Sequence, residues 1–159
     1  MKHAGFSLIE LLVVITIMGI LLGMGTLGFN SMSRKYAVDN QTRSLYSDLM
    51  EIRLKALYKK KSHYVTLASG SFTAYSSGDR STPVGVVMTR SLAKPIQWNG
   101  SGALIEFNSH GLTNDLRSIC VTQNETAPAL DSIVVATARV NLGKRQAGKD
   151  CDAAFIDIK

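Results

Sequence analysis

Glu10 is the single ionisable side chain in an otherwise apolar stretch of 24 residues that runs from Phe6 to Phe29. As a helix this stretch would be about 36 Å long, enough to cross a hydrocarbon core of about 30 Å. A carboxylate inside lipid costs at least about 2.5 kcal/mol, so it needs a place near the interface or a partner of opposite charge. Glu10 is therefore either a charge favoured by the dipole at a helix start or one half of an ion pair with a neighbouring molecule.

Other residue types that carry out catalysis form no recognisable arrangement. His3, His63 and His110 are scattered, and no serine stands in a Gly-x-Ser-x-Gly context. Glu106 has no second carboxylate at a spacing that would indicate paired acid–base chemistry, and no glycine-rich phosphate-binding motif is present. We expect no enzymatic activity, no cofactor and no metal site, and a membrane-anchored enzyme is the least favoured function class.

Helical periodicity continues beyond the apolar stretch. One stripe of apolar residues recurs at spacings of four, three and four, at Leu45, Leu49, Ile52 and Ala56. The pattern predicts a helix to about Lys61, in which 6–29 is the transmembrane half and 30–61 the amphipathic half. Glycines at positions 19, 23, 25 and 28 either allow helices to pack closely in lipid or let this helix melt locally.

From His63 onward the pattern changes to the alternation that is typical of strands. Six short segments, rich in β-branched and aromatic residues and separated by glycine-containing turns, predict strands at 64–67, 71–75, 84–88, 103–107, 118–121 and 132–136. The predicted fold class is α+β, with a long amino-terminal transmembrane and amphipathic α-helix packed on a carboxyl-terminal antiparallel β-sheet domain of residues 62–159.

The start of the chain resembles a known processing signal. Residues 5–14, GFSLIELLVV, are similar to the class III signal of type IV pilins and pseudopilins. The resemblance implies that a prepilin peptidase cleaves between Gly5 and Phe6, removes the leader 1–5 and methylates the new amino terminus at Phe6. It also implies that Glu10 pairs with the amine of Phe6 on a neighbouring subunit and so sets the axial register of a filament.

A weaker resemblance extends into the sheet domain. Residues 105–107, Gly111, 119–121 and 132–135 look like the sheet region of the GspH/FimT branch of pseudopilins and minor pilins. Ala138-Arg139 stands where many members of that branch have Gly-Arg.

The resemblance implies a minor pilin or pseudopilin of a type IV pilus or a type II secretion pseudopilus. Its partners would be other pilins or pseudopilins, prepilin peptidase and inner-membrane lipid, and an assembly ATPase would act only indirectly. Lys2 precedes the apolar stretch while Arg34 and Lys35 follow it, so charge alone does not orient the helix. Prepilin peptidases act from the cytoplasmic side, which implies a single-pass inner-membrane protein with a periplasmic carboxyl-terminal domain.

Two cysteines, Cys120 and Cys151, lie in the part expected in the periplasm. A pair in an oxidising compartment usually forms a disulfide, which here would close a loop of about thirty residues and stabilise by about 3–4 kcal/mol. Metal binding and a reactive thiol are the alternatives, although no histidine stands near enough in sequence to complete a zinc site.

The formal net charge of +6 is partly concentrated just before Cys151, at Arg139, Lys144, Arg145 and Lys149. A basic loop that contains glycines and is held by a disulfide could bind the phosphates of DNA. DNA-uptake members of the FimT branch are thought to bind DNA through a basic carboxyl-terminal tail, so a DNA-binding minor pilin is the alternative function. The other interpretation is a solvated loop whose charge is offset by nearby aspartates.

Overall fold

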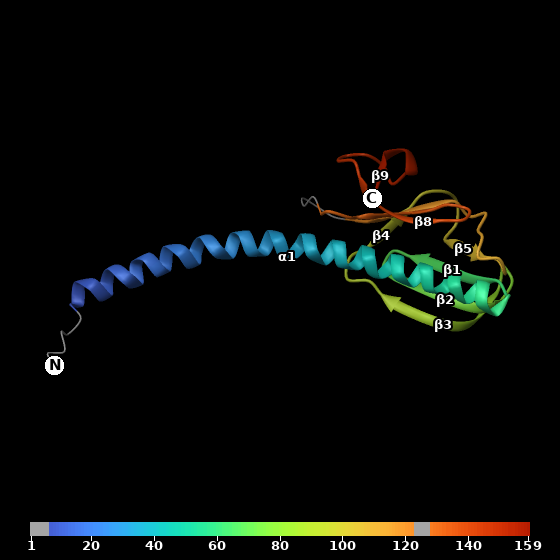
Figure 1. The fold of residues 1–159 in the computed structure, drawn as a ribbon, viewed down its shortest axis with the longest axis horizontal. Helices are drawn as coiled ribbons and strands as arrows, with labels where there is room; N and C mark the ends of the chain where they lie inside the picture. Colours follow the sequence, from blue (N-terminus) through green and yellow to red (C-terminus); the bar gives the residue numbers. More distant parts are fainter. Residues whose placement is uncertain (1–6, 123–127) are drawn as a thin grey trace. The chain divides into compact units, whose positions relative to one another are not determined.

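The computed structural model describes residues 7–122 and 128–159, with the backbone alone described at 24–28 (Figure 1). The expected cleavage site between Gly5 and Phe6 lies outside the described residues. The elements follow in the order α1 (Leu8–Lys59), β1 (His63–Ala68), β2 (Ser71–Gly78), β3 (Pro83–Ser91), β4 (Ile96–Trp98), β5 (Leu104–Phe107), β6 (Arg117–Val121), β7 (Ser132–Val135), β8 (Val140–Arg145), a 3-10 helix η1 (Ala153–Phe155) and β9 (Ile156–Ile158).

The chain divides into two compact units, Met1–Arg34 and Lys35–Lys159, and each is described by itself. In the first unit the chain is helical from Leu8, and the apolar side chains described there are exposed, Leu8 at 82% and Leu22 at 71%. Within the described part of the chain, no helix combines the length and hydropathy required of a membrane span.

The second unit begins with the part of α1 that carries the predicted apolar stripe. The four stripe residues, Leu45, Leu49, Ile52 and Ala56, are all buried. They share one apolar core with side chains from both sheets, among them Phe72 of β2 and Ile133 of β7. Each fully buried aliphatic side chain contributes about 1.5–3 kcal/mol, so the stripe is a principal source of the stability of this unit.

The helix ends at Lys59, two residues before the predicted end. Lys60 has a φ of 53°, in the left-handed region, and the amide of Lys61 donates to the carbonyl of Ala56 at 3.3 Å. A left-handed residue followed by this backward hydrogen bond is a Schellman-type end, which satisfies a carbonyl of the last turn.

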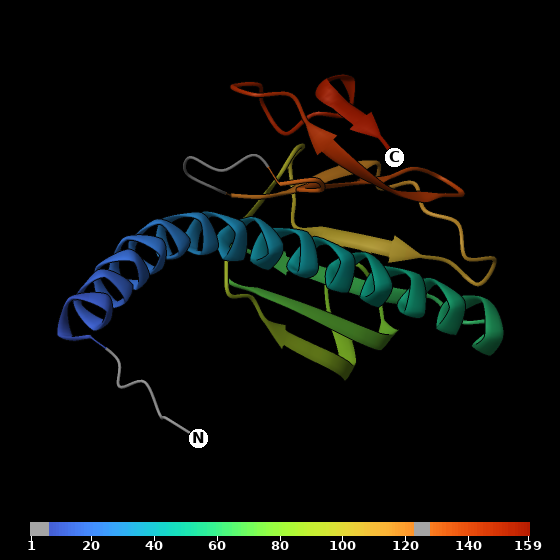
Figure 2. The same cartoon turned by 60° about the vertical axis from the view of Figure 1, so that its left-hand side comes forward.

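Two antiparallel sheets complete the second unit. One has four strands in the order β3-β2-β1-β5, and the other has five in the order β4-β6-β7-β8-β9. Figure 2 shows the later part of α1 lying along the four-stranded sheet, with the strands of the five-stranded sheet above it in that view. The predicted fold class, a long helix packed on an antiparallel β domain, is confirmed.

All six predicted strands are present, with ends that differ by at most three residues. The structure adds β4, β8 and β9, where the sequence predicted no strand. The reading of 139–149 as one basic loop is therefore wrong, because Lys144 and Arg145 lie in β8. β8 reads VNLGKR, and its polar half carries no apolar alternation from which a strand could be predicted.

Polar contacts hold the amphipathic part of α1 against the loops and strands around it. Arg90 of β3 forms a bidentate ion pair with the buried Asp48 of α1. Arg53 Nε donates to the carbonyl of Gly111 at 2.8 Å, and Gln41 exchanges hydrogen bonds with the backbone of Lys94. Because charge-assisted pairs with one buried partner are costly to break, these contacts fix the helix against sliding along the core.

Replacing Ile52 with alanine tests the contribution of the stripe. Ile52 is fully buried, so the truncation removes apolar contacts and leaves a cavity, and we expect the free energy of unfolding to fall by about 2–5 kcal/mol. Urea denaturation of the full chain in detergent measures it. Leu54→Ala, two residues away at a side chain that is 56% exposed, is the control and should change stability by under about 0.5 kcal/mol. Equal effects of the two variants would contradict the assigned packing.

Candidate functional site

Glu10 lies in the first turn of α1, within the first unit. The carbonyl of Ser7 accepts hydrogen bonds from the amides of Glu10 and Leu11, at 3.1 and 3.2 Å, which begins the helix just before the acid. The Glu10 side chain is exposed, and its neighbours Ile9 and Leu11 are also exposed, at 65% and 58%. Among the described residues Glu10 has no ion-pair partner, so its charge and the adjacent apolar surface are both open to another molecule.

Cys120 of β6 and Cys151 form a disulfide, as predicted, with 5.9 Å between their Cα atoms. Both are buried, and they form a small second apolar cluster with Val134 and Ile156. This cluster lies on the face of the five-stranded sheet opposite the main core, because Cys120 alternates with the core residue Ile119. The disulfide therefore attaches the carboxyl-terminal segment to the outer face of β6.

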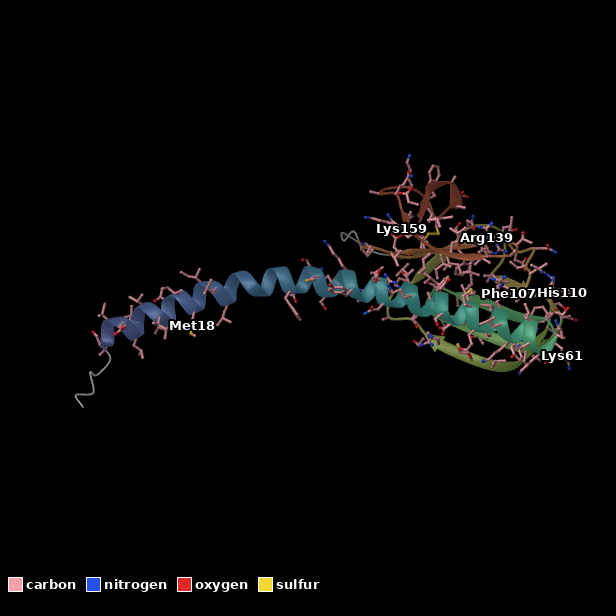
Figure 3. The ribbon with its side chains drawn as sticks, viewed as in Figure 1. Met18, Lys61, Phe107, His110, Arg139 and Lys159 are labelled. Atoms are coloured by element: carbon pink, nitrogen blue, oxygen red, sulfur yellow. A yellow bond between two sulfur atoms is a disulfide. The ribbon has the colours of Figure 1, made fainter. Side chains whose placement is uncertain are left out.

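The four basic residues suggested for DNA binding do not converge. Arg139 lies in the turn between β7 and β8, where its backbone pairs with that of Ala136, while Lys149 follows the other end of β8. The six residues of β8 between them span about 20 Å. Lys144 and Arg145 are consecutive in that strand, so they point to opposite faces of the sheet. Figure 3 shows Arg139 well apart from Lys159, which follows β9.

Two of these four cations, Lys144 and Lys149, also lie near groups that attract positive charge within the same domain. Lys144 stands directly opposite Asp157 in the antiparallel pairing of β8 with β9. Lys149 Nζ lies 5.4 Å from the centroid of the Phe155 ring, within range of a cation–π contact. The arrangement is that of charges distributed over a folded surface rather than a single phosphate-binding loop.

An ion-pair network that the sequence did not predict joins the β2–β3 connection to β5 and to the β5–β6 connection. Arg80, after β2, donates to both carboxylate oxygens of Asp115, at 3.0 and 2.7 Å, and to Glu106 of β5 at 3.2 Å. Asp115 also accepts from the amide of Glu106. These residues are 26 and 35 positions apart in sequence from Arg80, so no local spacing could indicate the network.

The network shifts the ionisation of its members. Burial raises the pKa of Asp115, but the hydrogen bonds from Arg80 and from the Glu106 amide outweigh it and leave the pKa below the ordinary value. Hydrogen bonds from the hydroxyls and amides of Ser81 and Thr82 lower the pKa of Asp79 to about 2. Both carboxylates are therefore ionised at neutral pH and hold the β2–β3 connection in place.

Neither His63 nor His110 forms an ion pair with an acid among the described residues. His63 is fully buried, with Nδ1 3.0 Å from the carbonyl of Lys61, and His110 is exposed in the loop after β5, near the end of α1 (Figure 3). Glu106 is engaged with Arg80 rather than with a second acid. The described residues contain no group of three or more histidine, cysteine or acidic side chains placed to hold a metal ion.

Both the start of the sequence and the fold are similar to known proteins. Residues 1–26 match the prokaryotic N-terminal methylation motif. Two crystal structures of the type IV minor pilin FimU from Pseudomonas aeruginosa have the same fold. One matches with a TM-score of 0.59 at 9% identity, over 70% of this chain and 91% of that chain. The other matches with a TM-score of 0.55 at 10% identity, over 65% and 90%.

The fold is that of a type IV pilin. No curated protein matches the sequence. The methylation motif covers the residues that resemble the class III signal, including Glu10, and the structural likeness extends over 70% of the chain.

Removing the disulfide should destabilise the second unit. The bond joins residues 31 positions apart, so the chain-entropy relation gives a loss of about 3–4 kcal/mol for the Cys120→Ser/Cys151→Ser double variant. Urea denaturation of the full chain in detergent measures the difference. A reducing agent should lower the stability of the native chain and leave the double variant unchanged. Identical unfolding curves for both proteins would show that the bond contributes nothing.

Asp115 should make stability depend on pH in the acid range. The pKa of Asp115 is lower in the folded chain than the unfolded value of about 3.9. Its contribution to the free energy of unfolding is therefore complete above that value and is lost as pH falls through the folded pKa. Asp115→Asn should lower stability at pH 7 and make the decline between about pH 5 and pH 2 less steep.

Thermal unfolding across this pH range is the measurement, and Asp150→Asn, at an exposed aspartate, is the control. A profile for Asp115→Asn parallel to that of the native chain would contradict the role given to this carboxylate.

Proposed function

We propose that this protein is a minor pilin or pseudopilin, a subunit that assembles through its amino-terminal helix into a type IV pilus or a type II secretion pseudopilus. The observation that carries the proposal is the methylation motif at residues 1–26, with Glu10 inside it, on a chain whose fold is that of a pilin. The partial resemblance to the GspH/FimT branch and the likeness to a minor pilin favour a minor component.

The exposed apolar surface of the first unit supports assembly. Leu8 is 82% exposed, Leu22 71% and Ile9 65%, and burial of each such side chain is worth about 1.5–3 kcal/mol. A surface of this kind must be covered by lipid before assembly and by the helices of neighbouring subunits afterwards. We infer a single pass through the inner membrane, a periplasmic β domain, and transfer into a filament that an assembly ATPase drives indirectly.

Glu10 supplies the specificity that apolar contact lacks. In the proposal, prepilin peptidase cleaves between Gly5 and Phe6, and the methylated amine of Phe6 meets the Glu10 carboxylate of an adjacent subunit. Each charge by itself raises the free energy of a helix in lipid. Pairing removes both penalties, but only at the axial offset between two helices that brings the amine and the carboxylate together. Head-to-tail contacts of this type give open filaments rather than closed rings.

DNA uptake is not proposed as a second function. The four cations on which it depended are spread over the turn before β8, both faces of β8 and the turn after it, and no described feature gathers them.

Changing Glu10 to glutamine should prevent assembly while leaving the β domain folded. The amide keeps the size of the side chain but removes the charge that pairs with the amine, and breaking a buried pair costs about 3–5 kcal/mol. Because about 1.4 kcal/mol corresponds to a factor of ten, we expect at least a tenfold fall in the amount of subunit recovered in sheared filaments. Glu51→Gln, at an exposed acid on the later part of α1, should assemble normally.

Processing is measured in the same samples. The intact mass of the membrane-extracted protein should correspond to a chain that begins at Phe6 with one added methyl group, in both variants. Normal incorporation of Glu10→Gln, or a mature chain that begins after Phe29, would overturn the proposal.

A further inference from the structure

Large apolar side chains are exposed at the carboxyl end of α1. Tyr58 is 88% exposed, and Leu54, one turn before it on the same face of the helix, is 56% exposed. Leu57 is exposed as well, and Gly111 of the loop after β5 lies against it. Leu112 follows Gly111 and is exposed beside the helix end. Burial in the main core therefore accounts for none of these four side chains.

Three lysines follow the exposed apolar residues directly. Lys59, Lys60 and Lys61 are all exposed, and no carboxylate of the described residues lies within ion-pair distance of them. Glu51 of the same helix pairs with Lys55 instead. Figure 3 shows Lys61 at the same end of the second unit as His110, which is also exposed and brings no negative charge. The helix-end patch, defined as Leu54, Leu57, Tyr58, Lys59–Lys61 and Leu112, thus combines positive charge with apolar surface.

The residue types in the helix-end patch indicate the chemistry of its partner. Lysine is depleted from protein–protein interfaces, in which arginine is enriched. Proteins that bind single-stranded nucleic acid stack its bases on aromatic side chains, whereas three of the four apolar residues here are leucines. Phospholipid bilayers match all three residue types, because acyl chains accept leucine, tyrosine lies at the headgroup level and lysine is attracted to anionic headgroups.

The place of the patch along α1 indicates which bilayer this is. The second unit begins at Lys35 and α1 ends at Lys59, so about 36 Å of helix separates the patch from the start of that unit. This length exceeds the thickness of a hydrocarbon core, about 30 Å. It favours a bilayer other than the one that the first unit is proposed to span.

We propose that the helix-end patch is a contact site for the surface of a second, anionic phospholipid bilayer. The three lysines bind the headgroup phosphates, and the side chains of Leu54, Leu57 and Tyr58 enter the interfacial layer. The inference rests on the proposed function only in that the first unit occupies a bilayer of its own. It requires neither Glu10 nor a filament.

The test uses the full chain reconstituted into vesicles of phosphatidylcholine, which are then immobilised. Fluorescent vesicles made of equal parts of phosphatidylcholine and phosphatidylglycerol are added, and the captured fluorescence is measured. We expect saturable capture of the anionic vesicles and no capture of fluorescent vesicles made of phosphatidylcholine alone. Capture should fall as the salt concentration is raised from about 0.1 M to about 1 M, because salt screens the lysines.

Variants locate the contact. Each lysine near an anionic surface contributes about a fivefold factor in affinity, so changing all three of Lys59–Lys61 to glutamine should weaken capture about a hundredfold. The matched control removes the same charge from exposed positions elsewhere in the second unit, with glutamine at Lys94, Arg139 and Lys159, and should capture normally. Leu54→Ala should weaken capture severalfold, because less apolar surface enters the bilayer.

Equal capture by the native chain and by the variant of Lys59–Lys61 would overturn the proposal. An equal loss in the matched control would do so too, since net charge alone would then explain the binding. Binding of duplex DNA or of polyglutamate by the native chain, without capture of anionic vesicles, would overturn it in favour of a nucleic acid or an acidic protein. Flotation of the chain with phosphatidylcholine vesicles tests the proposed anchor separately, so a chain that floats but captures nothing contradicts this inference alone.

Discussion

Burial of one helical stripe determines how the second unit is built. The stripe residues Leu45, Leu49, Ile52 and Ala56 contact a core to which both sheets contribute, so neither sheet can close its core without the helix. Removing the helix would expose core side chains of both sheets together. The β domain of this pilin fold is therefore not an independent body to which a helix is attached, and its stability depends on α1.

The two parts of α1 therefore differ in what their side chains contact. Beyond Lys35 its buried apolar residues form one stripe, and polar contacts such as Asp48 with Arg90 fix its position. Before that point the described apolar side chains are exposed on every face, and Glu10 is their only acid. A part that is fixed by its own domain and a part that remains open to other molecules are what a subunit needs in order to be stable alone and still assemble.

Prediction from the sequence succeeded where the signal was periodic or local. The stripe from Leu45 to Ala56, the six alternating strands and the isolated cysteine pair each have a pattern that one physical rule explains. It failed for β8 and β9, because a strand that ends Gly143-Lys144-Arg145 is held by its pairing with neighbours and not by its own propensity. The Arg80–Asp115 pair was missed for a related reason, since only the folded chain brings them together.

β6 contributes buried side chains to apolar clusters on both faces of its sheet. At Cys120 the strand is fixed to the carboxyl-terminal segment by the disulfide, and that segment in turn places Ala153 over the outer face of the sheet. Two residues earlier, Ser118 is buried, and Cys151 Sγ lies 3.5 Å from its carbonyl oxygen. The covalent bond and the apolar contacts around it therefore act together on the outer face of β6, which the main core does not reach.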